Sequence, residues 1–136
     1  ASFGLETAGV TVGGNVPPSH AHSATVEEYN GASWTTATAY PTAIKFASAC
    51  GIQTDGLVFS GNTPPNSVTG LTLGYDGTSW STRPSMATAR QAGAGAGTST
   101  AALMSAGANV GGTALTTTEE FTGQTTALNV KTITTS

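Results

Sequence analysis

The sequence repeats itself about every 46 residues, and a fixed period of this length restricts a chain to few architectures. Tyr29, Tyr75 and Phe121 stand 46 residues apart, and each precedes a dipeptide that ends in glycine. Trp34 and Trp80 follow at the same interval. Three glycines recur at nearly the same spacing: Gly14, Gly61 and Gly107. The sequence therefore predicts three equivalent units, over residues 1–45, 46–91 and 92–136.

The second unit shows how each repeat is expected to fold. Residues 46–52 and 57–59 are two predicted strands joined by a tight turn, and a long loop leads to a third strand ending at Tyr75. Asp76-Gly77 predicts a two-residue hairpin turn before a fourth strand that holds Trp80. Four antiparallel strands in about 46 residues are typical of one blade of a β-propeller. The predicted fold class is all-β.

The charge content narrows the possible partners. Charged residues make up 8% of the chain, the net charge is −3, and only four residues are Lys or Arg. Nucleic-acid surfaces need clustered cations, so no nucleic-acid partner is expected. No apolar run approaches the roughly 20 residues of a membrane helix, so no membrane insertion is expected. No cofactor motif is present, and we predict none.

The repeated residues resemble the kelch family. That family's order is a small-apolar strand, Gly-Gly, a loop, Tyr-Asp, Trp, Pro-Met and Arg. The second unit shows most of this order: Ser60-Gly61, Tyr75-Asp76, Trp80, Ser85-Met86 and Arg90. The third unit departs from it, with Thr126 where the Trp belongs. The resemblance covers essentially the whole chain and implies a kelch-like β-propeller, with three four-stranded blades in this chain.

Two segments, 27–35 and 95–103, are more narrowly similar to the kelch-like arrays of marine phage structural and tail-fibre proteins. This resemblance implies a non-enzymatic protein in the virion or outside the cell. It would bind a host-surface glycan or another virion protein. The alternative is a purely architectural oligomer that decorates a particle without a ligand.

Large rings are expected to fill the space between neighbouring blades, each burying about 150–250 Å². These rings are Tyr29, Trp34, Tyr75, Trp80 and Phe121. A sugar-stacking platform is the alternative, but the rings recur at framework positions, which favours a structural role. Gly14, Gly61 and Gly107 belong to the same framework. The alternating Ala and Gly of residues 92–97 suit the crowded innermost strand of a blade.

The long connections of the three units are expected to share one face of the molecule, over residues 15–24, 36–43, 62–68, 82–88 and 109–115. Loops on a rigid scaffold commonly carry binding sites. The candidate binding residues on this long-loop face are Pro17, Pro18, His20, His22, Tyr40, Pro64, Pro65, Asn66, Arg83 and Arg90. The kelch resemblance implies a second role for Arg90, that of bracing neighbouring loops.

Few residues suggest chemistry. His20 and His22 would share one side of a strand, but no further ligand lies nearby in the sequence, so we predict a solvated pair and no metal site. Some kelch propellers are copper oxidases with a Cys–Tyr cross-link, but Cys50 has no such partner in the sequence and is expected to be a small buried hydrophobe. The pairs Glu27-Glu28 and Glu119-Glu120 point to opposite faces of a strand, so neither forms a glycosidase pair; both are expected on a solvated edge. No residue is predicted to be catalytic.

Three blades do not close a propeller, which needs about four to eight. Either further copies of this chain complete the ring, most simply two copies with six blades, or further blades belong to a longer polypeptide. The first unit is expected to lack most of its inner strand, which favours a longer polypeptide. The alternating residues 128–135 are expected to form a terminal cap strand.

Overall fold

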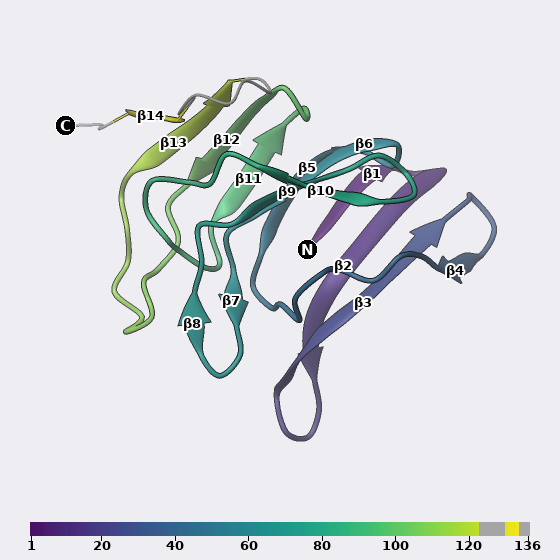
Figure 1. The fold of residues 1–136 in the computed structure, drawn as a ribbon, viewed down its shortest axis with the longest axis horizontal. Helices are drawn as coiled ribbons and strands as arrows, with labels where there is room; N and C mark the ends of the chain where they lie inside the picture. Colours follow the sequence, from purple (N-terminus) through teal and green to yellow (C-terminus); the bar gives the residue numbers. More distant parts are fainter. Residues whose placement is uncertain (123–129, 134–136) are drawn as a thin grey trace.

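Figure 1 shows the computed structural model of the chain, which describes residues 1–122 and 130–133, with side chains for residues 1–122. The described residues are all strand, turn and loop, which confirms the predicted all-β class. They include no helix, and therefore none with the length and apolar character needed to span a bilayer.

Three four-stranded antiparallel sheets make up the fold, each built from one continuous stretch of chain. Sheet 1 contains β1 (Ser2–Leu5), β2 (Ala8–Val16), β3 (Ala21–Tyr29) and β4 (Trp34–Thr36). Sheet 2 contains β5 (Ser48–Ile52), β6 (Asp55–Phe59), β9 (Thr72–Tyr75) and β10 (Trp80–Arg83). Between β6 and β9 the chain forms the small hairpin of β7 (Asn62–Thr63) and β8 (Ser67–Val68). Sheet 3 contains β11 (Ala94–Gly97), β12 (Ala101–Ser105), β13 (Thr118–Thr122) and β14 (Val130–Ile133).

The repeated aromatic residues occupy equivalent places in the three sheets. Tyr29 lies opposite Gly9, Tyr75 lies opposite Gly56, and Phe121 lies opposite Ala102 on the second strand of the same sheet. Residues 46 apart in the sequence therefore occupy the same position in the strand pairing of successive sheets.

Sheet 1 has a full inner strand, contrary to the expectation that the first unit lacks most of it. β1 pairs with β2 over four consecutive positions, from Ser2 opposite Thr11 to Leu5 opposite Ala8. The prediction failed because Ser2 and Phe3 do not resemble the Ala-rich inner strands of the other units. The expected cap strand over residues 128–135 lies partly outside the described residues, which place β14 at 130–133.

The turns after Tyr29 and Tyr75 are four residues long, not two as predicted. Tyr75 pairs with Trp80, and the Asp76 carboxylate accepts hydrogen bonds from the backbone N–H groups of Thr78 and Ser79, at 2.9 and 2.7 Å. Asn30 makes the equivalent bonds in sheet 1. An Asx side chain that caps its own turn stabilises the wider loop over the two-residue turn. The hydrogen bonds from Ser79 and Thr78 also lower the pKa of Asp76.

Of the glycines that recur in the sequence, Gly14 lies within β2, where the strand register shifts, and Gly61 and Gly107 lie shortly after β6 and β12. Gly14, Gly61 and Gly107 have φ angles of +134°, +114° and +98°, a region that favours glycine. The N–H of Gly14 donates to the carbonyl oxygen of Ile44, and that of Gly61 donates to the carbonyl oxygen of Arg90, both at 2.8 Å. Gly14 and Gly61 therefore connect sheets 1 and 2 to the linkers that lead to the next sheet.

The hydrophobic core lies between the sheets. One cluster joins Val10, Val12 and Val26 of sheet 1 to Val58, Leu73 and Tyr75 of sheet 2. A second cluster joins Cys50, Leu57 and Phe59 of sheet 2 to Ala102, Met104 and Phe121 of sheet 3. Sheet 2 therefore has both faces covered, whereas sheets 1 and 3 each have one covered face. Tyr40 and Ile44, from the linker after sheet 1, complete the first cluster.

Three of the five large rings, Tyr75, Trp80 and Phe121, lie between sheets, whereas Tyr29 and Trp34 lie on the open face of sheet 1. Tyr75 and Phe121 are buried, and Trp80 packs at 4.5 Å from Tyr75 and 4.9 Å from Tyr40, measured between ring centroids. Trp34 is 51% exposed and contacts Tyr29 alone among the described rings. Trp34 is exposed because no sheet of the described chain covers the face of sheet 1 that carries it.

A buried ion pair links sheet 3 to the linker before it. The Arg90 guanidinium donates to the Glu119 carboxylate at 2.6 Å, and both side chains are almost completely buried. Arg90 also donates to the carbonyl oxygens of Ala106 and Thr117. Glu119 accepts further hydrogen bonds from the N–H groups of Ala87 and Thr88. Glu119 is therefore a core residue, which corrects the prediction that it lies on a solvated edge.

The equivalent positions between sheets 1 and 2 hold an apolar pair. Ile44 stands 46 residues before Arg90, and Leu73 stands 46 residues before Glu119. Ile44 and Leu73 are both buried in the first core cluster. One site of the repeat therefore accepts either an ion pair or two aliphatic side chains.

We predict that Arg90→Ile and Glu119→Leu, made singly, each lower the free energy of unfolding by about 3–5 kcal/mol, because each leaves a buried charge without its partner. The double variant reproduces the Ile44–Leu73 pair and should lose clearly less than the sum of the two single losses. Urea denaturation of the four proteins measures this coupling. Additive losses would contradict the proposed equivalence.

A glycine allows a second close contact between sheets 1 and 2. A Cβ atom at Gly56 would lie 2.1 Å from the Phe3 ring, which packs edge-on to Tyr75. At Gly9, the equivalent position of sheet 1, the nearest atom to a Cβ would be 3.7 Å away, an ordinary contact distance.

We therefore expect Gly56→Ala to destabilise the protein by about 1–3 kcal/mol through overpacking. The matched variant Gly9→Ala should change the stability by less than about 1 kcal/mol. Thermal unfolding of both variants tests this difference. Equal destabilisation would show that glycine matters at these positions through the backbone and not through the Phe3 ring.

Candidate functional site: the long-loop end

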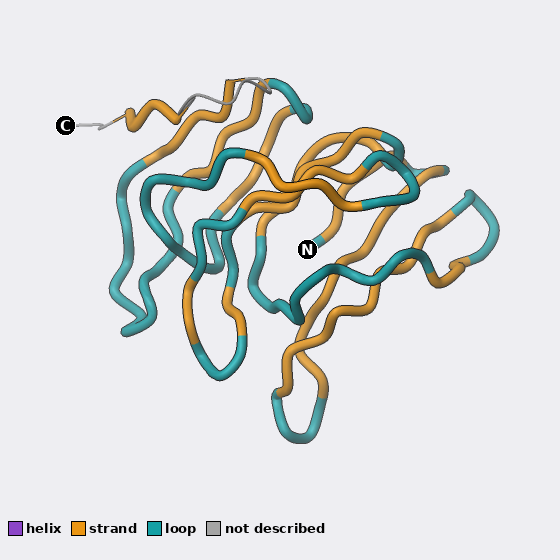
Figure 2. Tube along the Cα trace, viewed as in Figure 1, coloured by secondary structure: helices purple, strands orange, loops and turns teal. Residues whose placement is uncertain are grey.

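Three loops turn at the same end of the three sheets (Figure 1). They join β2 to β3, β7 to β8, and β12 to β13. Figure 2 shows them as the teal segments at the lower end of the trace. The tips of the first two carry exposed prolines, Pro17-Pro18 and Pro64-Pro65, each joined by a cis peptide bond. We call this region the long-loop end.

A hydrogen-bonded chain of side chains joins two of these loops. The His22 ring, on β3, makes a 2.7 Å hydrogen bond to the side-chain oxygen of Asn62 on β7. The Asn62 amide nitrogen donates at 2.9 Å to the side-chain oxygen of Asn66. Because Asn62 is buried, this chain fixes the position of the exposed Asn66 relative to sheet 1. The sequence offered no signal for Asn62, since its partner His22 is 40 residues away.

His20 lies in the turn before β3 and has different partners from His22. Its φ angle is +56°, and its Nδ1 atom lies 2.9 Å from the side-chain nitrogen of Asn15. The Lys45 ammonium donates to the His20 carbonyl oxygen at 3.2 Å. The two histidines therefore do not share one side of a strand. No group of three or more His, Cys, Asp or Glu side chains able to hold a metal occurs among the described residues.

The structure removes two predicted binding residues from the surface. Tyr40 is 2% exposed and packs against Trp80 in the core; burial raises the pKa of its hydroxyl. Arg90 is completely buried in the ion pair with Glu119. Their place in the sequence predicts exposed loops for both residues, but their linkers run between two sheets. The role that the kelch resemblance implies for Arg90, bracing neighbouring loops, agrees with its bonds to Ala106 and Thr117.

Arg83 is also not a loop residue. It is the last residue of the edge strand β10, and its guanidinium lies over Gly74. The predicted residues that the structure does bring to the long-loop end are Pro17, Pro18, His20, His22, Pro64, Pro65 and Asn66.

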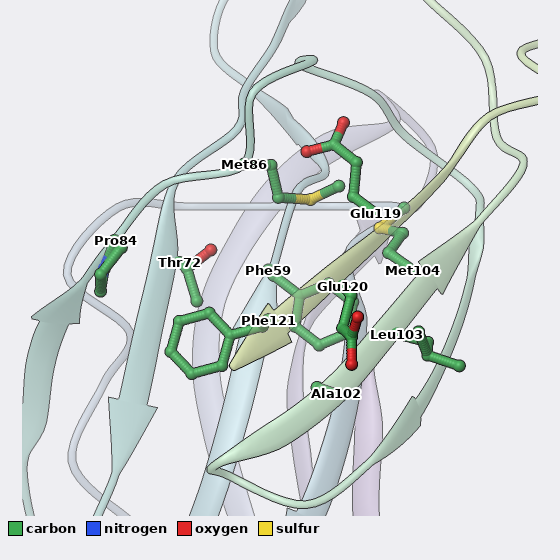
Figure 3. A pocket seen from close by; sticks show the side chains of 10 residues that line it. All are labelled: Phe59, Thr72, Pro84, Met86, Ala102, Leu103, Met104, Glu119, Glu120 and Phe121. Atoms are coloured by element: carbon green, nitrogen blue, oxygen red, sulfur yellow. The ribbon is translucent and has the colours of Figure 1, made fainter. Parts of the chain in front are cut away.

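A pocket that the sequence did not predict lies between sheets 2 and 3 (Figure 3). It encloses about 290 Å³, part of it open to solvent. Its lining is mainly apolar: Phe59, Pro84, Met86, Ala102, Leu103, Met104 and Phe121, with Thr72, Glu119 and Glu120. In the first unit, Thr38 is the equivalent of Pro84 and Tyr40 is the equivalent of Met86. Between sheets 1 and 2, the Trp80 indole lies against Tyr40 and donates to the carbonyl oxygen of Thr38. The equivalent of Trp80 in the third unit is Thr126, which lies outside the described residues.

Two further groups that could take part in chemistry, the Glu28 carboxylate and the Cys50 thiol, are engaged or buried in the fold. Glu28 accepts a 2.7 Å hydrogen bond from the Tyr75 hydroxyl, and burial together with this carboxylate raises the pKa of Tyr75. Cys50 is buried on β5, which confirms that prediction, and burial raises the pKa of its thiol to about 11. A thiol of that pKa is almost entirely protonated near neutral pH and is a poor nucleophile.

Comparison with known proteins shows the fold and no family. No protein-family model and no curated protein matches the sequence. A solved structure described as "Structure of YjhT" is similar, with a TM-score of 0.79 and 12% sequence identity. The match covers 98% of this chain and 44% of that chain, so this chain spans less than half of that protein's length. At this identity the likeness shows a shared fold alone.

Proposed function

We propose that the chain is a non-enzymatic binding module of kelch-like propeller type, in which each four-stranded sheet is a blade. It binds its partner through the long-loop end. The observation that carries this proposal is that three successive sheets turn their β2–β3, β7–β8 and β12–β13 loops to the same end (Figure 1), on a scaffold whose two core clusters lie between the sheets. A rigid scaffold with adjacent variable loops is a common arrangement for binding.

The chemistry of the long-loop end favours an uncharged, hydrogen-bonding partner. Its exposed residues include Ser19, His20 and Asn66 beside the prolines, and the nearest described cation is Lys45. Hydroxyl and amide groups suit a polysaccharide, and exposed prolines suit a protein surface. We therefore propose a host-surface glycan or a neighbouring structural protein as the partner. A virion or extracellular location follows only from the resemblance to phage repeat proteins.

A purely architectural role is the second candidate, and a different observation favours it. The outer faces of sheets 1 and 3 expose large apolar side chains, among them Trp34 and Leu103. Faces of this kind are suited to assembly and require no ligand at the loops.

The two roles separate in one binding experiment. We expect the purified chain to bind a component of a panel of bacterial surface polysaccharides and virion proteins. The double variant His20→Ala/Asn66→Ala should weaken that binding about tenfold or more, because it removes polar groups of two adjacent loops. Biolayer interferometry measures the dissociation constants.

The matched control is Thr54→Ala, an exposed position in the β5–β6 turn. It should leave binding unchanged. Absence of binding to every polysaccharide and virion protein would favour the architectural role. Equal weakening by Thr54→Ala would refute the placement of the site at the long-loop end.

A further inference from the structure

The contacts between sheets join two kinds of face. A leading face packs on the trailing face of the sheet before it. The leading face of sheet 2 carries Val58, Leu73 and Tyr75, and the trailing face of sheet 1 carries Val10, Val12, Val26 and Glu28. In the second contact, the leading face of sheet 3 carries Met104, Glu119 and Phe121, and the trailing face of sheet 2 carries Leu57, Phe59 and Gly74.

One face of each kind is left open in the described part of the chain. The leading face of sheet 1 carries Thr11, Glu27, Tyr29 and Trp34. The trailing face of sheet 3 carries Leu103, Ser105 and Glu120. Figure 1 shows these two sheets at opposite sides of the molecule, with sheet 2 between them.

At one position of the repeat, each closed contact has both a hydroxyl and a carboxylate or has neither. Between sheets 1 and 2, the Tyr75 hydroxyl donates to Glu28 across the contact. Between sheets 2 and 3, the equivalent residues are Phe121, which has no hydroxyl, and Gly74, which has no side chain. A buried carboxylate without a donor is costly, so the two positions have to match.

The open faces hold the two halves of a third such pair. Tyr29 is the equivalent of Tyr75, and Glu120 is the equivalent of Glu28 and Gly74. Neither the Tyr29 hydroxyl nor the Glu120 carboxylate makes a hydrogen bond with any described residue. Within this chain the two groups lie in different sheets, with sheet 2 between them, so they can meet only if two chains associate.

The exposure of the apolar side chains on the open faces also indicates that these faces lack a covering sheet. Leu103 is 44% exposed, whereas its equivalent Leu57, covered by sheet 3, is fully buried. Trp34 is 51% exposed and has one ring neighbour, whereas its equivalent Trp80 lies between Tyr75 and Tyr40. A trailing face laid on the open leading face would cover both residues.

We propose that the trailing face of sheet 3 packs on the leading face of sheet 1 of a second copy of this chain, with the Tyr29 hydroxyl donating to the Glu120 carboxylate. Made twice, this contact joins two copies with two identical interfaces and six sheets. The inference rests on the proposed propeller architecture. The similar solved structure supports it in one respect, since two copies of this chain together approach the length of that protein.

Sedimentation of the purified chain over a range of concentrations tests the proposal. We expect a dimer that dissociates on dilution. Tyr29→Phe should raise the dimer dissociation constant about tenfold or more, because Glu120 then loses its donor across the interface. Tyr29→Phe/Glu120→Gly reproduces the Phe121–Gly74 pair and should dimerise more tightly than Tyr29→Phe alone.

The matched control is Tyr75→Phe, which removes the same hydrogen bond inside one chain. It should lower the stability to urea and leave the dissociation constant unchanged. Leu103→Arg, at an exposed position, should abolish the dimer while the circular dichroism spectrum stays the same.

A chain that stays monomeric at every concentration overturns the inference, as does a dimer that tolerates Leu103→Arg. In either case, retained ligand binding that still depends on His20 and Asn66 leaves the proposed binding function intact. A dimer that behaves as expected while no ligand binds would support the interface and refute the binding function.

Discussion

The packing of one sheet against the next is the interaction on which the rest of this structure depends. No sheet has a core of its own, because a single four-stranded sheet is one layer and must bury its apolar face against another. Both core clusters lie between sheets, and the linkers contribute Tyr40, Ile44 and Arg90 to those contacts. The free energy of unfolding is therefore expected to come mainly from the contacts between neighbouring sheets, as in other repeat proteins.

The two inter-sheet contacts share a geometry and differ in chemistry. Ile44 and Leu73 occupy the positions that Arg90 and Glu119 occupy one repeat later. Tyr75 and Glu28 occupy the positions of Phe121 and Gly74. In each case both members of a pair differ together, because a buried charge or hydroxyl is tolerated only with its partner present. The repeat thus fixes the backbone and the register, while each contact has its own pair of side chains.

The sequence could predict the features that depend on period and local pattern. The spacing of Tyr29, Tyr75 and Phe121 indicated an all-β fold and the equivalent places of these rings. It could not predict burial, which depends on what covers a residue. Trp34 and Trp80 are identical in the repeat, yet only Trp80 has a neighbouring sheet over it. Tyr40 and Arg90 seemed exposed because their linkers have loop composition, although those linkers run through the core. The pairing of His22 with Asn62 had no local signal at all.

The placement of the cations bears on what the long-loop end can recognise. Arg90 is neutralised by Glu119 inside the fold, and Arg83 lies over Gly74 on an edge strand. Lys45 is the described cation beside the loops, and its ammonium already donates to the His20 carbonyl oxygen. Tight binding of a polyanion requires several unpaired cations on one surface, and the described residues of the long-loop end do not provide them. In the proposed binding function, recognition relies on hydrogen bonds from exposed polar groups such as Asn66, whose position Asn62 fixes, and on contact with the prolines. That chemistry favours a neutral glycan or a protein surface over an acidic polymer, and it leaves the apolar outer faces of the sheets free to serve assembly.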